Sequence, residues 1–282
     1  MRFVHVLCLF VSVSVLSACS REGGEPHSKL EADHGHRSPM ASSEEYIVGG
    51  TKVRRGDPVA AATVALMQAN DWTFCTGTLI SNRHVLTAAH CLADFQGAEL
   101  YVGFGPGALV KSTPSFAKSG AAVERVLASH YVVHGEFDQT AVAQLHPLHA
   151  PHDIALVTLS ADAPAGFQPM PMLTQQDGLV IGEPLILAGF GLTQAEGGTS
   201  GQLRKVKTTL TGVWAEAAEI EFGDSPGKSA CNGDSGGPAY VKRSGKYQLI
   251  GVTSRGLVGC GGGGIYTDVR SYQQWIAANE RA

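Results

Sequence analysis

The sequence is poor in charge and in the features that mark several protein classes. Only 16% of the 282 residues are charged, the net charge is −4 and no long Lys or Arg run occurs, so no nucleic-acid partner is expected. No repeat of fixed period is present, and the longest apolar run is shorter than the roughly 18–20 residues of a membrane span. Six cysteines are too few for a disulfide-stapled miniprotein. The length suits one large domain or two small ones.

The first 18 residues have the pattern of an export signal. Arg2 is followed by an apolar run over residues 3–16 and then by the small residues Ser17 and Ala18. A short positive region, an apolar region and a small-residue cleavage site are typical of a signal peptide. The alternative is an N-terminal helix that is retained as an anchor. We expect residues 1–18 to be removed.

The residues around the expected cleavage site resemble a lipoprotein signal. The tetrapeptide over residues 16–19, Leu-Ser-Ala-Cys, resembles the bacterial lipoprotein box. The resemblance implies that the Cys19 sulfur carries acyl chains, and two or more chains anchor a protein stably. Because Ser20 is not acidic, the resemblance favours the outer membrane. An ordinary signal that happens to contain Cys19 is the alternative, which predicts a secreted or periplasmic protein.

Residues 19–46 are predicted to form a flexible tether. Residues 20–46 hold few large apolar side chains and many charged residues, together with Gly, Ser, Pro and His. Such a stretch buries too little surface to offset its ordering entropy. Its histidines are interpreted as solvated residues of a linker, and no metal site is expected.

The rest of the chain, residues 47–282, has the pattern of an all-β domain. Short β-prone runs alternate with Gly, Pro, Asn and Asp, which predicts a sandwich or a barrel. One helix is predicted near the end, over residues 271–279, where Tyr272, Trp275 and Ile276 share one face. The predicted strands are 62–67, 77–80, 85–89, 100–104, 122–128, 154–159, 184–189, 203–211, 237–241, 247–254 and 264–269.

Three separated segments carry groups suited to nucleophilic catalysis. They are Leu-Thr-Ala-Ala-His-Cys at 86–91, Asp-Ile-Ala-Leu-Val at 153–157 and Cys-Asn-Gly-Asp-Ser-Gly-Gly-Pro at 231–238. A serine hydroxyl needs a base to take its proton, and histidine titrates in the right range. Together, in the order His, Asp, Ser, the segments resemble the chymotrypsin/trypsin-like serine proteases. The resemblance covers residues 47–282.

The resemblance implies a fold and a role for each residue. The fold would be two packed six-stranded antiparallel β-barrels with a C-terminal helix and a catalytic cleft between the barrels. Ser235 would be the nucleophile, His90 the general base and then acid, and Asp153 the residue that orients the imidazole. The backbone N–H groups of Gly233 and Ser235 would form the oxyanion hole. The alternative is an inactive binding protein with this fold.

A zymogen form is also implied. Ile47-Val48-Gly49-Gly50 resembles the mature N-terminus of the family, in which the freed ammonium group pairs with the residue corresponding to Asp234. The residue before the cut is Tyr46, where most relatives have Arg or Lys. Because the expected pocket suits Tyr46, the hypothesis is that the protein cuts itself in trans, and activation by another protease is the alternative.

The specificity pocket is located by position within the resemblance. Ser229 would form its base, Gly256 and Gly264 its walls, and Ser254 and Gly256 the edge that binds an extended substrate. An uncharged base with two glycine walls predicts a chymotrypsin-like preference for aromatic or large apolar P1 residues, with elastase-like or trypsin-like preferences as alternatives. Arg255 replaces the usual Trp, and it either attracts acidic substrate residues or extends into solvent.

The remaining cysteines are expected to form two bridges. The resemblance pairs Cys75 with Cys91 and Cys231 with Cys260, which requires an oxidising compartment. No cofactor or metal is expected, because Pro147 and Pro151 disfavour a helix that would align the nearby histidines. We expect an exported monomeric serine endopeptidase with polypeptide substrates, protein inhibitors as further partners, and membrane contact only through the lipid at Cys19.

Overall fold

The computed structural model describes residues 47, 49–96, 99–107, 124–144, 149–193, 200–223, 227–257 and 260–281. The predicted signal peptide over 1–18, the tether over 19–46 and its residues Cys19 and Tyr46 lie outside the described residues. Among the described residues no helix is long and apolar enough to cross a membrane.

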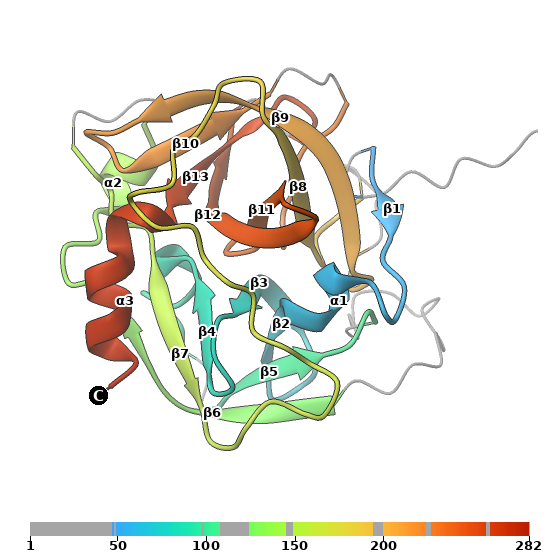
Figure 1. The fold of residues 1–282 in the computed structure, drawn as a ribbon. Helices are drawn as coiled ribbons and strands as arrows, with labels where there is room; N and C mark the ends of the chain where they lie inside the picture. Colours follow the sequence, from blue (N-terminus) through green and yellow to red (C-terminus); the bar gives the residue numbers. More distant parts are fainter. Residues whose placement is uncertain are drawn as a thin grey trace, which may run out of the picture. The chain divides into compact units, whose positions relative to one another are not determined.

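Six antiparallel strands of the N-terminal half close into a barrel (Figure 1). Their short apolar segments put Leu66, Val102 and Leu156 in its interior. The order around the barrel is β2 (Thr63–Gln68), β3 (Thr73–Leu79), β4 (His84–Thr87), β7 (Ala155–Leu159), β6 (Glu124–Val133) and β5 (Leu100–Phe104).

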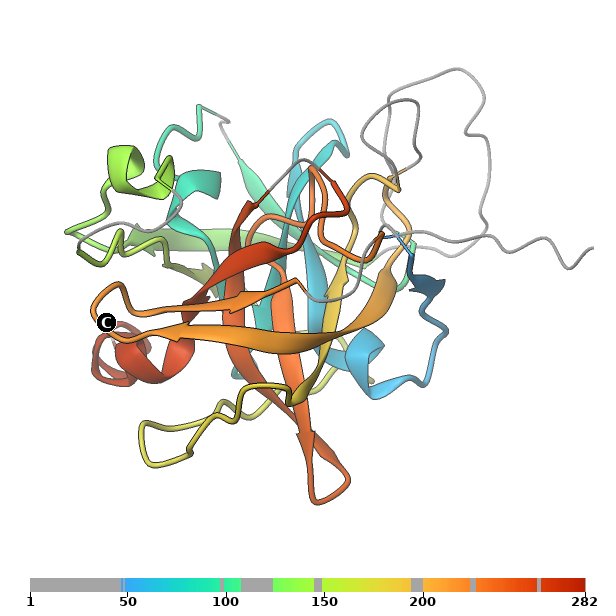
Figure 2. The same ribbon diagram turned by 90° about the horizontal axis from the view of Figure 1, so that it is seen from above.

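The C-terminal half forms a second closed barrel, because β8 and β9 also pair with each other. Along β9 the alternation expected of a half-buried strand is clear: Val206 and Leu210 are buried, whereas Lys207 is exposed. Figure 2 shows β9 and β10 running side by side. The order is β9 (Arg204–Trp214), β10 (Glu219–Phe222), β13 (Gly264–Asp268), β12 (Lys246–Gly256), β11 (Pro238–Arg243) and β8 (Pro184–Gly189), with β1 (Thr51–Lys52) added at the edge of β9.

Helical structure is short. The predicted C-terminal helix is confirmed as a 3-10 turn, η2 (Val269–Tyr272), followed by α3 (Gln273–Asn279), which buries Ile276. The other helical segments, which the sequence analysis did not predict, are α1 (Pro58–Ala62), α2 (Gln139–Val142) and the 3-10 turn η1 (Ala89–Cys91). In α1 and α2 an aspartate caps the first turn, Asp57 and Asp138 respectively.

The predicted all-β fold of two six-stranded barrels is therefore confirmed. The predicted strands lie within a few residues of the observed ones, but β1 and β10 were missed. Hydrogen bonds join the barrels: the Thr63 and Tyr240 hydroxyls lie 2.9 Å apart, and the Thr76 backbone N–H donates to the Ser235 carbonyl at 2.8 Å. These contacts place the Ser235 loop of the second barrel against the first.

Candidate active site

His90 and Asp153 are brought together by the first barrel. His90 lies in η1 after β4, and Asp153 precedes β7, the strand that pairs with β4. The Asp153 carboxylate accepts hydrogen bonds from the His90 backbone N–H at 2.9 Å and from the His90 Nδ1–H at 2.8 Å. With the proton on Nδ1, the imidazole presents Nε2 as an acceptor.

The second barrel completes the surroundings of Asp153. The Ser254 hydroxyl donates to the Asp153 carboxylate at 2.6 Å, and the Thr267 hydroxyl donates to the Asp153 backbone carbonyl at 2.9 Å. Asp153 is fully buried, so its charge depends on these donors. Sequence reasoning had placed Ser254 on the substrate edge and had missed Thr267.

The charge of Asp153 sets the titration of His90. Burial lowers the pKa of His90, but the negative charge of Asp153 and its hydrogen bond outweigh burial and hold this pKa above its usual value. The protonated imidazole is thus favoured by its partner. A base of this kind can accept a proton and retain it on the time scale of a reaction step.

Ser235 lies in the turn before β11, held against the segment that leads into His90. A Cβ on the neighbouring Gly236 would lie only 2.0 Å from the Thr87 hydroxyl oxygen, so only glycine permits this approach. The Thr76 hydroxyl donates to the Gly233 carbonyl at 2.9 Å and accepts from the Phe190 N–H at 3.2 Å. Thr76, which the sequence analysis missed, therefore fixes the turn of the second barrel to the first.

Asp234 is buried next to Ser235 with few partners. Its carboxylate accepts from the Gly191 N–H at 2.8 Å and from the Cys231 N–H at 2.8 Å. Burial raises its pKa to about 7, against the effect of these two bonds. Among the described residues no cationic side chain forms an ion pair with it.

Ile47, the residue that follows the predicted activation cut, is among the described residues. Its side chain is buried in the core of the second barrel, and its backbone has a φ of 44°. Left-handed backbone is strained for a β-branched residue. Ile47 therefore occupies a buried position at a conformational cost in the uncut chain.

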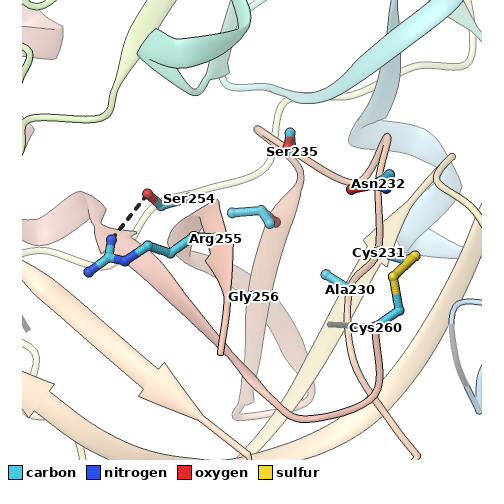
Figure 3. A pocket seen from close by; sticks show the side chains of 9 residues that line it. Ala230, Cys231, Asn232, Ser235, Ser254, Arg255, Gly256 and Cys260 are labelled. Carbon is cyan, nitrogen blue, oxygen red and sulfur yellow. Dashed lines mark hydrogen bonds between the residues drawn. A yellow bond between two sulfur atoms is a disulfide. The ribbon is translucent and has the colours of Figure 1, made fainter. Parts of the chain in front are cut away.

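A cavity of about 370 Å³ opens beside Ser235 (Figure 3). Ser254 and Arg255 lie on one side of it, and the disulfide cysteines Cys231 and Cys260 lie on the other. Its lining residues are Ala230, Cys231, Asn232, Ser235, Thr253, Ser254, Arg255, Gly256 and Cys260. Of the pocket residues expected from the sequence, Ser254 and Gly256 line the cavity.

Two of the expected pocket residues do not line this cavity. Ser229 is fully buried, its hydroxyl donates to the Ala230 carbonyl at 2.8 Å, and neither Ser229 nor Gly264 is among the described residues that line the cavity. Gly264 pairs with Phe222 across β13 and β10. A Cβ on Gly264 would lie 2.9 Å from Phe222 Cζ, so the Phe222 ring packs directly against this expected wall residue.

Both expected disulfides are present. Cys75 is bonded to Cys91, directly after His90, and Cys231 is bonded to Cys260 in the cavity wall. Each bridge therefore ties a segment of the site to a distant strand or loop. A bridge of this loop length contributes about 3 kcal/mol to stability.

Arg255 adopts neither of the two expected arrangements. Its guanidinium forms a two-pronged ion pair with Glu219 of β10, at 2.6 Å and 2.8 Å. The side chains are 12% and 2% exposed, so Arg255 does not extend into solvent, and its charge is matched within the protein. Sequence reasoning missed Glu219 because it missed β10.

A histidine cluster includes His152, the residue directly before Asp153. The potential ligand atoms of His134, Glu136 and His152 lie within 4.8 Å of one another. The two imidazole rings are stacked with centroids 4.5 Å apart and planes within 5°. Lone pairs in parallel ring planes point side by side and do not converge on one metal ion, so the cluster is better described as an aromatic stack with Tyr272.

A buried carboxylate, a histidine and a serine at the junction of two antiparallel barrels define the class of serine hydrolases with this architecture. Residues 47–276 match the trypsin family. The chain belongs to this family of serine proteases.

Two relatives share one name. Chymotrypsin-like elastase family member 1 of Canis lupus familiaris is 26% identical over 266 residues, which is 86% of this chain and 96% of the relative. The protein of that name from Rattus norvegicus is 25% identical over 262 residues, 86% of this chain and 93% of the relative. The similarity thus extends over nearly the full length of both relatives.

Proposed function

We propose that the protein is a serine endopeptidase that acts through an acyl-enzyme. Ser235 Oγ attacks the scissile carbonyl carbon while His90 Nε2 takes the hydroxyl proton, and His90 then gives that proton to the leaving amine. Water then attacks the acyl carbon while His90 takes its proton, and His90 returns that proton to Ser235 Oγ as the ester bond breaks and the acid product leaves. Asp153 stabilises the imidazolium, and the N–H groups of Gly233 and Ser235 receive the oxyanion.

The observation that carries this proposal is the hydrogen bond from His90 Nδ1 to the buried Asp153 carboxylate. His90 follows the segment that packs against the Ser235 turn. The test is hydrolysis of peptide substrates by the full chain after cleavage at Tyr46–Ile47, with Ser235→Ala as the control. We expect turnover that the Ser235→Ala variant lacks. Peptidase activity equal in the two proteins would contradict the assignment, and a cut protein without activity would support an inactive binding protein.

The preferred P1 residue is proposed to be small and apolar. None of the described residues that line the cavity is acidic, so they offer no partner to a basic P1 side chain. The Phe222 ring, which lies beside Gly264, is proposed to shorten the P1 slot and so to favour alanine or valine over aromatic residues. The elastase name of the two relatives agrees with this preference, whereas the glycines alone would favour a chymotrypsin-like one.

A panel of peptides that differ only at P1 tests the preference. We expect Ala and Val to be cleaved faster than Phe and Tyr, and Phe222→Ala to increase kcat/KM for aromatic P1 about tenfold or more. Phe222→Leu is the milder variant if the cavity prevents folding. Phe104→Ala removes an equally buried ring from the first barrel and should not change the preference. Fastest cleavage after Arg, or after Tyr in the unaltered protein, would contradict the proposal.

Activation is proposed to require a cut between Tyr46 and Ile47. After the cut, Ile47 would be an N-terminal residue and its backbone would no longer be held at a positive φ. Its new ammonium group would belong to a residue that is already buried in the second barrel. That group is the natural partner for Asp234, which is buried with two backbone donors. Because aromatic P1 residues are disfavoured, another protease is expected to make the cut. Mixing active enzyme with the Ser235→Ala precursor should leave Tyr46–Ile47 intact, and cleavage there would show self-activation.

The protein is proposed to be exported and lipid-anchored at Cys19, acting as a monomer on polypeptides outside the cytoplasm. Two structural disulfides support an oxidising compartment. Labelling of cells with a fatty-acid probe should mark the wild-type chain and not Cys19→Ser, and the variant should be released in soluble form. Equal labelling of both proteins would contradict the anchor.

A further inference from the structure

We propose that the Arg255–Glu219 ion pair is a positioning device for the catalytic centre: it holds the Ser254 hydroxyl on Asp153 and neutralises the charge that each partner would place beside His90. The inference rests on the proposed function of His90 and Asp153. It assigns a role to two residues outside the expected catalytic set.

The ion pair is built into the sheet and is not a surface contact. Both guanidinium Nη atoms of Arg255 donate to the two carboxylate oxygens of Glu219, at 2.6 Å and 2.8 Å. This parallel arrangement is the strongest geometry available to the two side chains. Since Glu219 is only 2% exposed, its charge requires the partner that Arg255 supplies.

A β-bulge places the pair next to the active site. Between β12 and β13, Thr253 pairs with Tyr266 and Arg255 pairs with Ile265, so Ser254 is the extra residue of a bulge. Bulges redirect side chains and often lie beside active sites. The Arg255 side chain crosses the neighbouring strand β13 and reaches Glu219 on β10. The pair thereby connects the bulged segment of β12 to β10, which lies two strands away in the sheet.

The hydroxyl of Ser254 connects the pair to the catalytic centre. It donates to the Asp153 carboxylate at 2.6 Å and lies 3.4 Å from the donating Arg255 Nη1, the contact drawn in Figure 3. A hydroxyl has one proton and two lone pairs, so a donor on one lone pair favours directing the proton to Asp153. A continuous chain of polar contacts runs from Glu219 to His90.

The ion pair affects the charge near the catalytic centre as well as its geometry. Removing Glu219's charge leaves a buried cation near Asp153, which disfavours the imidazolium and lowers the pKa of His90; removing Arg255's charge has the opposite effect. The charge of Glu219 also raises the pKa of Tyr272. Both variants retain the other titratable side chains of the region. They are Asp153 itself, Tyr272, His152, His134, Glu136, and Asp268 with its partner Arg270.

Four variants separate charge from geometry. Glu219→Gln should move the acid limb of the kcat/KM profile to lower pH, and Arg255→Gln should move it to higher pH. The double variant, which pairs two neutral amides, should bring the limb back to the wild-type position. Arg255→Lys keeps the charge but cannot form the two parallel hydrogen bonds to Glu219. We expect the acid limb to stay at its wild-type pH and kcat to fall about tenfold.

A matched control lies elsewhere in the second barrel. Arg243 and Glu183 form another two-pronged pair, at 2.8 Å and 2.7 Å, away from the cavity. Glu183→Gln should lower the melting temperature comparably and leave the pH profile unmoved. If Arg255→Gln fails to fold, the comparison of Glu219→Gln with Glu183→Gln still decides the matter.

The titration of the His90 imidazole by NMR gives a second readout that does not depend on peptidase activity. Opposite shifts of the His90 pKa in the two single variants support the proposal. Shifts of the same sign, or an unmoved His90 pKa with a lowered melting temperature, would overturn it and leave the pair a purely structural bridge. A protein without activity whose His90 still shifts as stated would contradict the proposed function alone.

Discussion

Each barrel buries one aspartate at the active site, and the two are held in very different ways. Asp153 of the first barrel receives the His90 backbone N–H, the His90 Nδ1–H and the Ser254 hydroxyl. Asp234 of the second barrel receives two backbone N–H groups only, and burial raises its pKa to about 7. One carboxylate is fully partnered in the uncut chain, whereas the other is not.

One part of the site therefore has all its hydrogen-bond partners in the uncut chain, whereas the other part does not. The His90–Asp153 pair needs nothing further to present Nε2 to a substrate. The turn that carries Asp234 and Ser235 includes a carboxylate that lacks a cationic partner among the described residues. Since a buried carboxylate without a counter-charge is costly, the account assigns control of activity to the second barrel.

The largest effect is expected from removing the charge of the partnered aspartate. Asp153→Asn keeps the shape but favours the wrong imidazole tautomer, so kcat should fall about 10⁴-fold, as the corresponding exchange does in a well-studied serine protease. Steady-state kinetics of the cut protein measure this. A loss of less than about tenfold would show that Asp153 does not orient His90.

The second prediction concerns Asp234, where cut and uncut proteins should respond with opposite signs. In the uncut chain the raised pKa means that ionisation opposes folding, so the free energy of unfolding falls as the pH rises from about 4 to about 7. Asp234→Asn removes this dependence and should raise the melting temperature of the uncut protein at pH 8. In the cut protein the same variant should lose the partner of Ile47, with lower stability and activity.

Thermal melts of both forms at pH 4 and pH 8 check this, with Asp162→Asn as a surface control. Asp162 is largely exposed, and its replacement should leave the melts unchanged. Destabilisation of the uncut protein by Asp234→Asn at pH 8 would remove the contrast between the two aspartates.

The third and smallest effect is a displaced pH profile. Because Asp153 holds the pKa of His90 above its usual value of 6.5, the acid limb of kcat/KM should have its midpoint above that pH. Activity requires the neutral imidazole and is therefore lost as the pH falls through this raised pKa. A midpoint below 6.5 would mean that burial outweighs Asp153.

The sequence was sufficient for the parts of the protein that local motifs encode. The segments around His90, Asp153 and Ser235 predicted the residues that the fold brings to one junction, and the two disulfides followed from the same resemblance. The limits of most strands were predictable because apolar and turn residues alternate clearly, as in β8, where the predicted and observed limits coincide.

The missed features depend on pairing between distant strands. The four residues of β10, Glu-Ile-Glu-Phe, are too few for a clear period, and their partners in β9 and β13 become neighbours only in the fold. Because β10 was missed, two contacts of its residues were missed as well: the ion pair of Glu219 with Arg255 and the Phe222 ring at Gly264. Arg255 was correctly singled out as unusual, but a single position gives no information on which carboxylate it contacts.

The most direct test of the account is covalent labelling of the serine before and after the cut. A fluorophosphonate probe is added to the uncut chain and to the same chain cleaved at Tyr46–Ile47, and the labelled peptide is identified by mass spectrometry. The account predicts labelling of Ser235 in the cut protein and nearly none in the uncut protein. Equal labelling of both forms, or labelling at a residue other than Ser235, would contradict it.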